Sequence, residues 1–269
     1  MDGELVFIKL GGSVITEKAK PFTERHDVIV RLANEIHSSR TKTGIRLIVG
    51  NGGGSYPHIP AEKYQTHLGL NEANGRMGAA LVQDAASQLN RIVVNALLES
   101  GEPAVSVQPS SAVVAQNSKI SDWDLSALKL MLKANILPVT YGDLGMDLIK
   151  GVSILSTEEI FRYLSTKLSP SRVIIGTNVD GVYDGDPQKN THARKIDLIT
   201  PKNASEVLPF LGGANTVDVT GGMRSKVLTL IELVKDVDIE CEVVNLMIPG
   251  ALQEILNGER GKGTVIRRR

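Results

Sequence analysis

Short apolar runs rich in valine and isoleucine alternate along this chain with longer stretches of helical periodicity. The run Leu5–Leu10 predicts a buried strand, and Val28, Ile29, Leu32 and Ile36 then mark one face of a helix. Strands that alternate with helices are typical of a mainly parallel sheet with helices on both faces. The sequence therefore predicts an α/β fold.

The alternation continues to the end of the chain. The longest predicted helix runs from about Glu72 to Ser100 and is closed by Gly101. Further strands are expected at Arg46–Val49, Ala104–Val107, Leu137–Thr140, Val152–Leu155, Arg172–Gly176, Glu242–Val244 and Thr264–Ile266. Further helices are expected at Asp124–Ala134, Thr157–Leu168, Ala204–Leu211, Gly222–Lys235 and Ala251–Leu256. No repeat or linker is evident, so we expect one domain over residues 1–269 with a functional division near residue 170.

Charge and cysteine content exclude several classes of protein. Thirty basic and thirty acidic residues cancel, whereas a nucleic-acid-binding protein depends on a basic face that neutralises phosphates. The single cysteine, Cys241, lies in an apolar run and predicts a buried thiol without a disulfide. The acidic N-terminus lacks an apolar signal core and no stretch is long enough to cross a membrane, so we expect a cytoplasmic protein.

The residues that follow the strands are the candidates for a functional site, because ligands bind beyond the carboxyl ends of parallel strands. The first strand leads into Lys9, Gly11, Gly12 and Ser13, with Lys18 a few residues later. Such glycines let backbone N–H groups approach an anion, and the lysines add positive charge beside it. An ordinary tight turn with exposed lysines explains this segment equally well.

The second strand ends in four glycines within five residues, at positions 50 and 52–54. This density costs chain entropy, which favours close approach of Gly53 and Gly54 to a ligand over a plain loop. His58 follows and becomes a plausible donor to a bound phosphate, although a lone histidine is more often structural. The segment nearly matches a dinucleotide-binding fingerprint, with Ser55 where glycine or alanine belongs, and such a near-match is weak.

Two later segments complete the set. Residues 177–187, which include Asn178, Asp180 and Asp184, fit either turn chemistry or a loop that binds the ribose edge of a nucleotide. Their spacing does not fit a calcium loop. Glycines 221 and 222 open a helix and place Lys226 about one turn inside it, where its charge suits a transferring phosphoryl group. No Walker A loop and no zinc-binding pattern is present.

Taken in this order, the segments resemble the amino acid kinase family. Lys9–Ser13, Gly52–Gly54, Thr177–Asp186 and Asp218–Lys226 match its motifs, and the resemblance covers nearly the whole chain. Within the family, two lysines followed by a histidine after the glycine loop look like the archaeal-type isopentenyl phosphate kinases. That branch makes isopentenyl diphosphate from isopentenyl phosphate and ATP.

The resemblance implies a three-layer αβα sandwich, a homodimer, and ATP with Mg²⁺ as cofactor. Residues 1–170 would bind the phosphate acceptor and residues 171–269 would bind ATP. The catalytic groups would be Lys9, Lys18, His58 and Lys226. The acceptor would be held by Gly53, Gly54, His58 and Thr157. The nucleotide would be bound by Lys9, Gly11, Gly12, Ser13, Gly54, Asn178, Asp180, Tyr183, Asp184, Gly185, Asp186 and Lys226.

Two positions depart from the family pattern. Pro57 stands where glycine is usual and stiffens the turn before His58. Thr157 stands where the family has a glycine whose N–H meets the acceptor, and its side chain is expected to narrow that space.

The chemistry of the acceptor distinguishes the alternatives. A phosphate monoester is already nucleophilic near neutral pH, so positioned cations suffice and no general base is needed. We expect an apolar tail to lie along the helix that begins near Glu72, which carries Met77, Ala80 and Leu81 on its early turns. The alternatives are a fosfomycin-type, uridylate-type or acetylglutamate-type kinase, a non-catalytic nucleotide-binding regulator and, from the near-fingerprint, a nicotinamide dehydrogenase.

Overall fold

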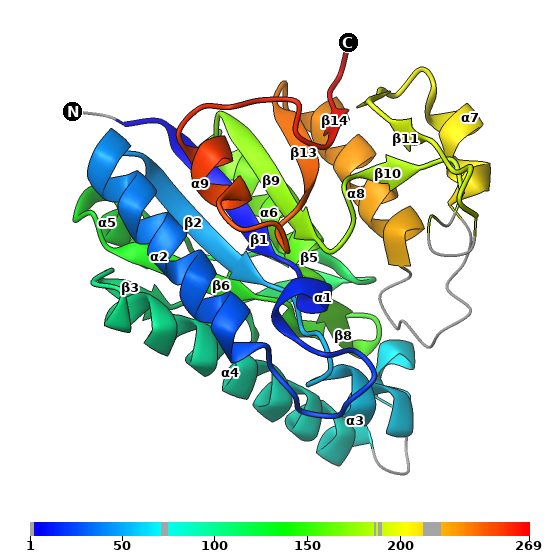
Figure 1. Cartoon of the computed structure of the whole chain (residues 1–269). Coiled ribbons are helices and arrows are strands. Elements are labelled where there is room, and N and C mark those ends of the chain that lie inside the picture. The colour runs from blue at the N-terminus through cyan, green and yellow to red at the C-terminus, as the bar shows by residue number, and fades with distance from the viewer. Residues whose placement is uncertain (1–2, 71–74, 186, 188–189, 212–221) are drawn as a thin grey trace.

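The computed structural model describes residues 3–70, 75–185, 187, 190–211 and 222–269. An eight-stranded sheet forms its middle layer (Figure 1). The strand order is β12 (Leu198–Ile199), β14 (Thr264–Ile266), β13 (Glu240–Asn245), β9 (Arg172–Thr177), β1 (Leu5–Leu10), β2 (Arg46–Asn51), β6 (Leu137–Tyr141) and β3 (Ala104–Ser106). Neighbouring strands are parallel except for β13 and β14.

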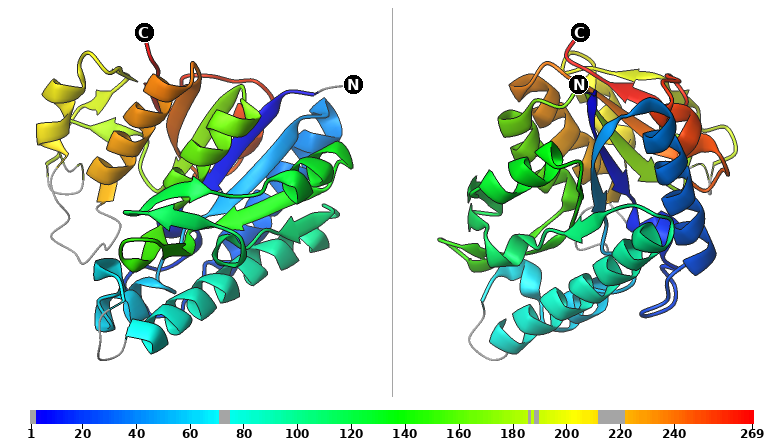
Figure 2. Two further views of the ribbon diagram at one scale, coloured as in Figure 1. Left: turned by 180° about the vertical axis from the view of Figure 1, so that it is seen from behind. Right: turned by 90° about the vertical axis from the view of Figure 1, so that its left-hand side faces the viewer.

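Helices cover both faces of this sheet, as Figure 2 shows from two further directions. One face carries α2 (His26–Thr43), α4 (Gly75–Glu99) and α9 (Ala251–Leu256). The other face carries α5 (Ser126–Lys133), α6 (Thr157–Leu168) and α8 (Gly222–Asp236). The predicted α/β sandwich is therefore confirmed.

Strand β1 illustrates why the sheet is central. All six of its residues are buried, and all except Lys9 are apolar, so the strand does not alternate between a buried and an exposed face. Phe7 points to the α6 side, where its ring lies 5.3 Å from the ring of Phe161. Val6 and Ile8 pack on the opposite side with α2 and α4. Cys241, in β13, is fully buried as predicted, and burial raises the pKa of its thiol.

A second, four-stranded sheet was not predicted. Its order is β5 (Lys119–Asp122), β4 (Val114–Gln116), β7 (Asp143–Asp147) and β8 (Gly151–Leu155). The predicted strand Val152–Leu155 is therefore real, but it belongs to this smaller sheet and pairs antiparallel with β7. The apolar pattern of a strand does not indicate which other strand it will pair with. The placement of Val152–Leu155 in the main parallel sheet was therefore wrong, although the strand itself was predicted.

Short elements fill the connections. They are α1 (Gly12–Ile15), α3 (His58–Lys63), α7 (Ala204–Val207), the 3₁₀ turns η1 (Thr66–Leu68), η2 (Pro109–Ser111) and η3 (Leu208–Phe210), and the hairpin of β10 (Val182–Tyr183) with β11 (Lys195–Ile196). The helix predicted over Ala204–Leu211 is thus α7 followed by η3. Pro209 lies in the first turn of η3, and proline lacks the N–H that would continue an α-helix.

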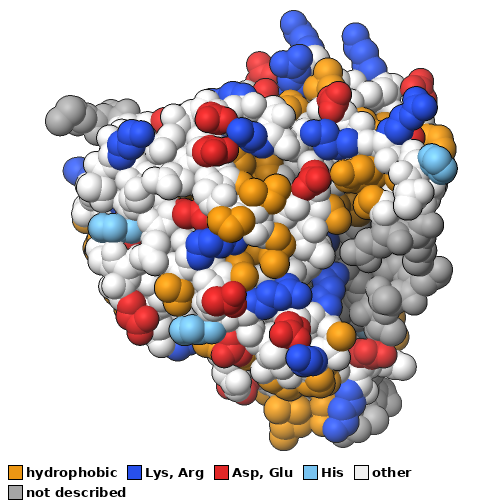
Figure 3. Space-filling view, viewed as in Figure 1, with side chains coloured by type: hydrophobic (Ala, Val, Ile, Leu, Met, Phe, Trp, Pro, Cys, Tyr) orange, Lys and Arg blue, Asp and Glu red, His pale blue; other side chains and the backbone are white. Residues whose placement is uncertain are grey.

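The face of the molecule seen in Figure 3 carries basic and acidic side chains interspersed with one another. No large area of a single sign dominates this view, in keeping with the zero formal net charge. Among the described helices, none combines the length and apolar character required to cross a membrane.

Candidate active site

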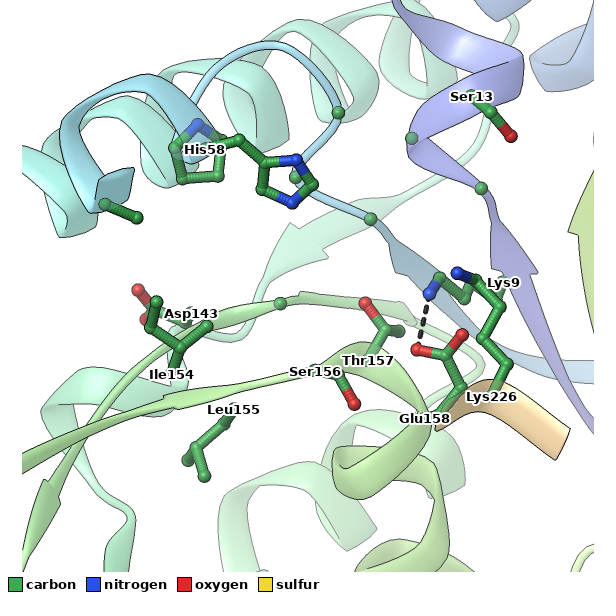
Figure 4. Close-up of a pocket in the computed structure, with 18 of the residues that line it drawn as sticks. Lys9, Ser13, His58, Asp143, Ile154, Leu155, Ser156, Thr157, Glu158 and Lys226 are labelled. Carbon is green, nitrogen blue, oxygen red and sulfur yellow. Dashed lines mark hydrogen bonds and ion pairs between the residues drawn. The ribbon is translucent and has the colours of Figure 1, made fainter. Parts of the chain in front are cut away.

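A pocket lies at the carboxyl edge of the main sheet, where β1, β2 and β9 end (Figure 4). Parallel pairing aligns these strands, so segments far apart in the sequence meet there. The lining includes ten of the predicted site residues: Lys9, Gly11, Gly12, Ser13, Lys18, Gly53, Gly54, His58, Thr157 and Lys226.

Glycines allow the loops around the pocket to pack backbone against backbone. A side chain at Gly11 would overlap the carbonyl oxygen of Gly176, and one at Gly12 would overlap the backbone nitrogen of Gly54. No other residue type fits such close approach without a shift of the chain. The turn after β1 is thereby fixed against both the glycine loop and the end of β9.

The glycines at the end of β2 and directly after it also serve packing within the chain. The bare Cα of Gly50 faces the side chains of Thr157 and Phe161, that of Gly53 faces Pro57, and that of Gly54 faces Thr16. Gly54 in addition has a positive φ of 56°. At these positions the missing side chains make room for protein atoms, and the approach of a ligand to Gly53 and Gly54 stays a prediction.

Lys9 forms a buried ion pair with Glu158 at the base of the pocket. The Nζ of Lys9 donates to Oε2 of Glu158 at 2.5 Å, and both side chains are almost completely buried. Burial acts to raise the pKa of Glu158, but the charges of Lys9 and Lys226 and the hydrogen bond from Lys9 lower it overall. Glu158 therefore stays ionised and holds the Lys9 ammonium group in place.

Lys226 and Lys18 complete a group of three lysines around the pocket. Lys226 lies in the second turn of α8, where its Nζ donates to the carbonyl of Gly222 at 3.3 Å. Figure 4 shows it beside Lys9 and Glu158. Lys18 is exposed on the segment between α1 and α2. Lys9 and Lys18 come from β1 and the segment after it, and Lys226 comes from α8, more than 200 positions later in the sequence.

His58 approaches the same pocket from the opposite side in Figure 4. It is the first residue of α3 and is partly buried. Pro57, the residue before it, has a φ of −75° and adopts a helical conformation at the start of α3. Its ring lies over Gly53, so proline stiffens this turn without moving the histidine out of the pocket.

The side chain of Thr157 is turned towards strand β2. Its hydroxyl donates to the carbonyl of Asn51 at 2.8 Å, and its methyl group lies against the bare Cα of Gly50. Gly50 thus provides the space that threonine needs at this position. The expectation that the side chain of Thr157 narrows the pocket is therefore wrong, because most of that side chain packs against β2.

An apolar wall lies beside His58. It is formed by Ala61 of α3, Val82 of α4 and Ile154 of β8. Helix α4 therefore contributes to the wall as expected, but through Val82. The three residues named from the sequence do not line the pocket: Met77 and Leu81 are 60% and 38% exposed, and Ala80 is exposed as well.

Two carboxyl groups in the pocket were missed by the sequence analysis. One is Glu158. The other is Asp143, which is 2% exposed and accepts a hydrogen bond from the N–H of Ser110 through Oδ2 at 2.9 Å. Its Oδ1 has no hydrogen-bond partner among the described residues, and burial raises the pKa of Asp143 to about 6. Asp143 follows β6, a strand of the parallel sheet, so the rule that ligands bind at the carboxyl ends of parallel strands could have identified it. Glu158 follows β8, which pairs antiparallel with β7, and the rule does not apply there.

Known proteins share both the sequence and this arrangement. The model of the amino acid kinase family matches residues 4–245. This chain belongs to the amino acid kinase family. The isopentenyl phosphate kinase of Methanothermobacter thermautotrophicus is 36% identical, with 97% of this chain and 98% of that protein covered. The isopentenyl phosphate kinase of Methanocaldococcus jannaschii is also 36% identical, over 83% of this chain and 85% of that protein.

Solved structures of the family agree. An isopentenyl phosphate kinase structure superposes with a TM-score of 0.84 at 33% identity and covers 97% of this chain and 99% of its own. The Thermoplasma acidophilum isopentenyl phosphate kinase in a product complex gives a TM-score of 0.78 at 25% identity, with 98% and 100% covered.

The nucleotide residues predicted between positions 178 and 186 do not line this pocket, unlike those predicted near β1, β2 and α8. Thr177 lines it, but Asn178, Asp180, Tyr183, Asp184 and Gly185 do not, and Asp186 lies outside the described residues. Two carboxylates of this segment have partners within the chain: Asp180 accepts from Asn245 at 2.7 Å, and Asp184 accepts from the N–H of Arg194 at 2.7 Å. Turn chemistry explains the second contact, and the nucleotide role of the segment stays a prediction.

No group of three or more potential metal ligands occurs in the part of this kinase that the structure describes. Mg²⁺ commonly binds through substrate phosphates and water with only one or two carboxylates, so this finding does not test the expected Mg²⁺.

Proposed function

We propose that this chain transfers the γ-phosphoryl group of ATP to isopentenyl phosphate and releases isopentenyl diphosphate and ADP. The observation that carries the proposal is a single pocket in which lysines and a histidine lie beside an apolar wall. Such a pocket suits an acceptor with a phosphate at one end and a hydrocarbon at the other. The two relatives that are 36% identical carry the name of this activity.

The lysines address the main obstacle, which is that two anionic substrates must meet. Lys9 and Lys226 lie beside each other and would stabilise the negative charge on the transferring phosphoryl group. Glu158 keeps Lys9 in a fixed position, since the ion pair removes most of the freedom of the lysine side chain. Lys18 and the N–H groups of the glycine turn would add further positive potential.

The acceptor phosphate would bind at His58 and the glycine loop, with its hydrocarbon tail against Val82 and Ile154. Its oxygen attacks the γ-phosphorus, the bond to the bridging oxygen of ATP breaks, and ADP leaves. No general base takes part, because the phosphate monoester is nucleophilic near neutral pH. Glu158 is unsuited to that role, since its carboxylate is already paired with Lys9.

The nucleotide would occupy the part of the site beyond β9, with residues 178–186 along its edge. Mg²⁺ would accompany ATP and lower the negative charge of its phosphates. The homodimer and the cytoplasmic location expected from the sequence also belong to this proposal. Light scattering coupled to gel filtration tests the dimer.

An acceptor panel tests the proposed reaction. Purified protein is incubated with MgATP and isopentenyl phosphate, uridylate, acetylglutamate, fosfomycin or carbamate, and ADP release is measured. We expect isopentenyl phosphate to give the highest kcat/KM by a wide margin. A higher value with another acceptor would reassign the kinase, and ATP binding without turnover on any acceptor would favour a regulatory protein.

A further inference from the structure

Lys18 is carried by a short hairpin between α1 and α2, residues 16–25, which we call the Lys18 hairpin. Thr16 and Glu24 face each other as an isolated antiparallel bridge. The N–H of Glu17 donates to the carbonyl of Thr23 at 2.9 Å, and the N–H of Lys20 donates to that of Glu17 at 3.0 Å. The tip that holds Lys18 is therefore closed by its own hydrogen bonds.

The Lys18 hairpin is docked on the residues that follow the glycine loop. The N–H of Ser55 donates to Oγ1 of Thr16 at 3.0 Å. In the other direction, the N–H of Phe22 donates to the carbonyl of Ser55 at 3.3 Å, and the N–H of Thr23 donates to the hydroxyl of Ser55 at 3.3 Å. These contacts link the two loops that line one side of the pocket.

Tyr56 makes the side-chain part of this contact. It is 4% exposed, and its hydroxyl donates to Oε2 of Glu24 at 2.5 Å. That hydrogen bond is the main reason that the pKa of Glu24 is lowered. The rings of Tyr56 and Phe22 meet edge to face, with a centroid distance of 5.3 Å and an angle of 69° between their planes.

Phe22 indicates that this docking is needed to keep the hairpin in shape. It has a φ of 47°, in the left-handed region that a bulky residue rarely adopts, and its side chain is 45% exposed. Such a conformation persists only when surrounding contacts hold it. In this structure the holding contacts come from Ser55 and Tyr56.

We propose that Tyr56 is a positioning residue that fixes the Lys18 hairpin against the glycine loop and so keeps Lys18 at the pocket. Lys18 lies at the tip of this hairpin, and the position of the hairpin backbone depends on the contact with residues 55 and 56. The catalytic consequence rests on the proposed function. The structural consequence, a firmly docked hairpin, does not.

The test uses Tyr56→Phe, which removes only the hydroxyl, in a double-mutant cycle with Lys18→Ala. We expect Tyr56→Phe to lower kcat with isopentenyl phosphate about tenfold, the value of one hydrogen bond to a charged group, with ATP affinity unchanged. In the Lys18→Ala background it should have almost no further effect, because the lysine it positions is gone. Glu24→Gln, which keeps an acceptor for the hydroxyl, should retain most of the activity. Tyr163→Phe, on α6, is the matched control.

Equal losses from Tyr56→Phe with and without Lys18 would overturn the proposal, as would a fall in melting temperature that accounts for the whole effect. Amide hydrogen exchange of residues 17–23 gives a readout that does not depend on activity. Faster exchange in Tyr56→Phe than in Tyr163→Phe would support the docking role, and unchanged exchange would refute it. If the wild-type protein does not phosphorylate isopentenyl phosphate, the proposed function fails while hydrogen exchange still decides the role of Tyr56.

Discussion

Lys9 and Glu158 are 149 positions apart in the sequence, and their charged groups lie 2.5 Å apart in the pocket. A buried pair of this kind adds little net stability, because desolvation opposes the attraction between the charges. The ion pair does, however, restrict the position of the Lys9 ammonium group. In a reaction that depends on the placement of cations, that restriction is the more useful property.

His58 determines the choice of acceptor in this account. A hydrogen bond donated to a charged group is worth roughly 1.5–3 kcal/mol, or about ten- to a hundredfold in rate or affinity. His58→Ala should therefore reduce kcat/KM for isopentenyl phosphate by about that factor while ATP affinity survives. His58→Gln, which keeps a donor, should recover part of the loss. His67→Ala, at an exposed histidine of the same region, is the control. Normal turnover by a folded His58→Ala enzyme would exclude this role.

Lys226 should act mainly on the transition state. Its side chain lies beside Lys9 and Glu158, so its charge is placed for the transferring group. We expect Lys226→Ala to lower kcat by at least about a hundredfold, with a much smaller change in KM. Lys235→Ala, at an exposed lysine in the last turn of the same helix, provides the comparison. If Lys226→Ala raised only KM, the lysine would serve substrate binding.

Asp143 predicts a pH-dependent stability. Its pKa is raised from 3.8 to about 6, so between these values the folded protein binds more protons than the unfolded chain. The contribution of Asp143 to the free energy of unfolding is therefore largest below about pH 4 and is lost as the pH rises through 6. Asp143→Asn has no charge to bury and should be more stable than wild type at pH 7.5, by at most about 3 kcal/mol. The difference in melting temperature should shrink towards pH 4, and a constant difference would argue against a buried charge.

At the scale of elements, the small sheet depends on one carboxylate. Asp147, at the end of β7, accepts hydrogen bonds from the N–H groups of residues 117, 118, 149 and 150 at 2.7–3.1 Å. It thus joins the β4–β5 turn to the β7–β8 turn. Burial opposes its charge, but these four donors lower the pKa of Asp147 well below its ordinary value.

Asp147→Asn should therefore destabilise the protein by about 2–3 kcal/mol at neutral pH, because an amide cannot accept all four bonds and its NH₂ group faces donors. Since the folded pKa is lowered, the stabilisation exists above pH 4 and is lost as the pH falls, so the variant should approach wild type in acid. Urea unfolding at pH 7 and at several pH values from about 4 down to about 2 measures this convergence. Asp122→Asn, at an exposed carboxylate of β5, should change stability by less than about 0.5 kcal/mol. An equal effect of the two substitutions would contradict the role of Asp147.

The elements differ in how far the sequence predicts them. Helix α6 begins and ends where its periodicity indicates, at Thr157 and Leu168. Ser156 caps its N-terminus, because its hydroxyl accepts a hydrogen bond from the N–H of Glu159. The small sheet carries no such signal. In β5 only Ile120 of four residues is buried, and β4 has three residues, too few for a period of two to be distinct.

At the scale of the whole molecule, parallel pairing accounts for the part of the site that was predictable. Because β1, β2 and β9 run side by side in the same direction, the segments after them were expected to meet, and Lys9, His58 and Thr177 do line one pocket. Glu158 was not predicted, since a glutamate in the first turn of a helix is ordinary until the fold buries it next to a lysine. That pairing is a property of the folded chain.

In the proposed reaction, this pocket joins a phosphate monoester to the γ-phosphoryl group of ATP. Phosphorus NMR of the wild-type protein with MgATP and isopentenyl phosphate observes that bond directly. We expect the monoester signal to disappear and two coupled diphosphate signals of isopentenyl diphosphate to grow in step with ADP, one molecule for each ATP consumed. Release of inorganic phosphate with ADP while the monoester signal persists would exclude this reaction.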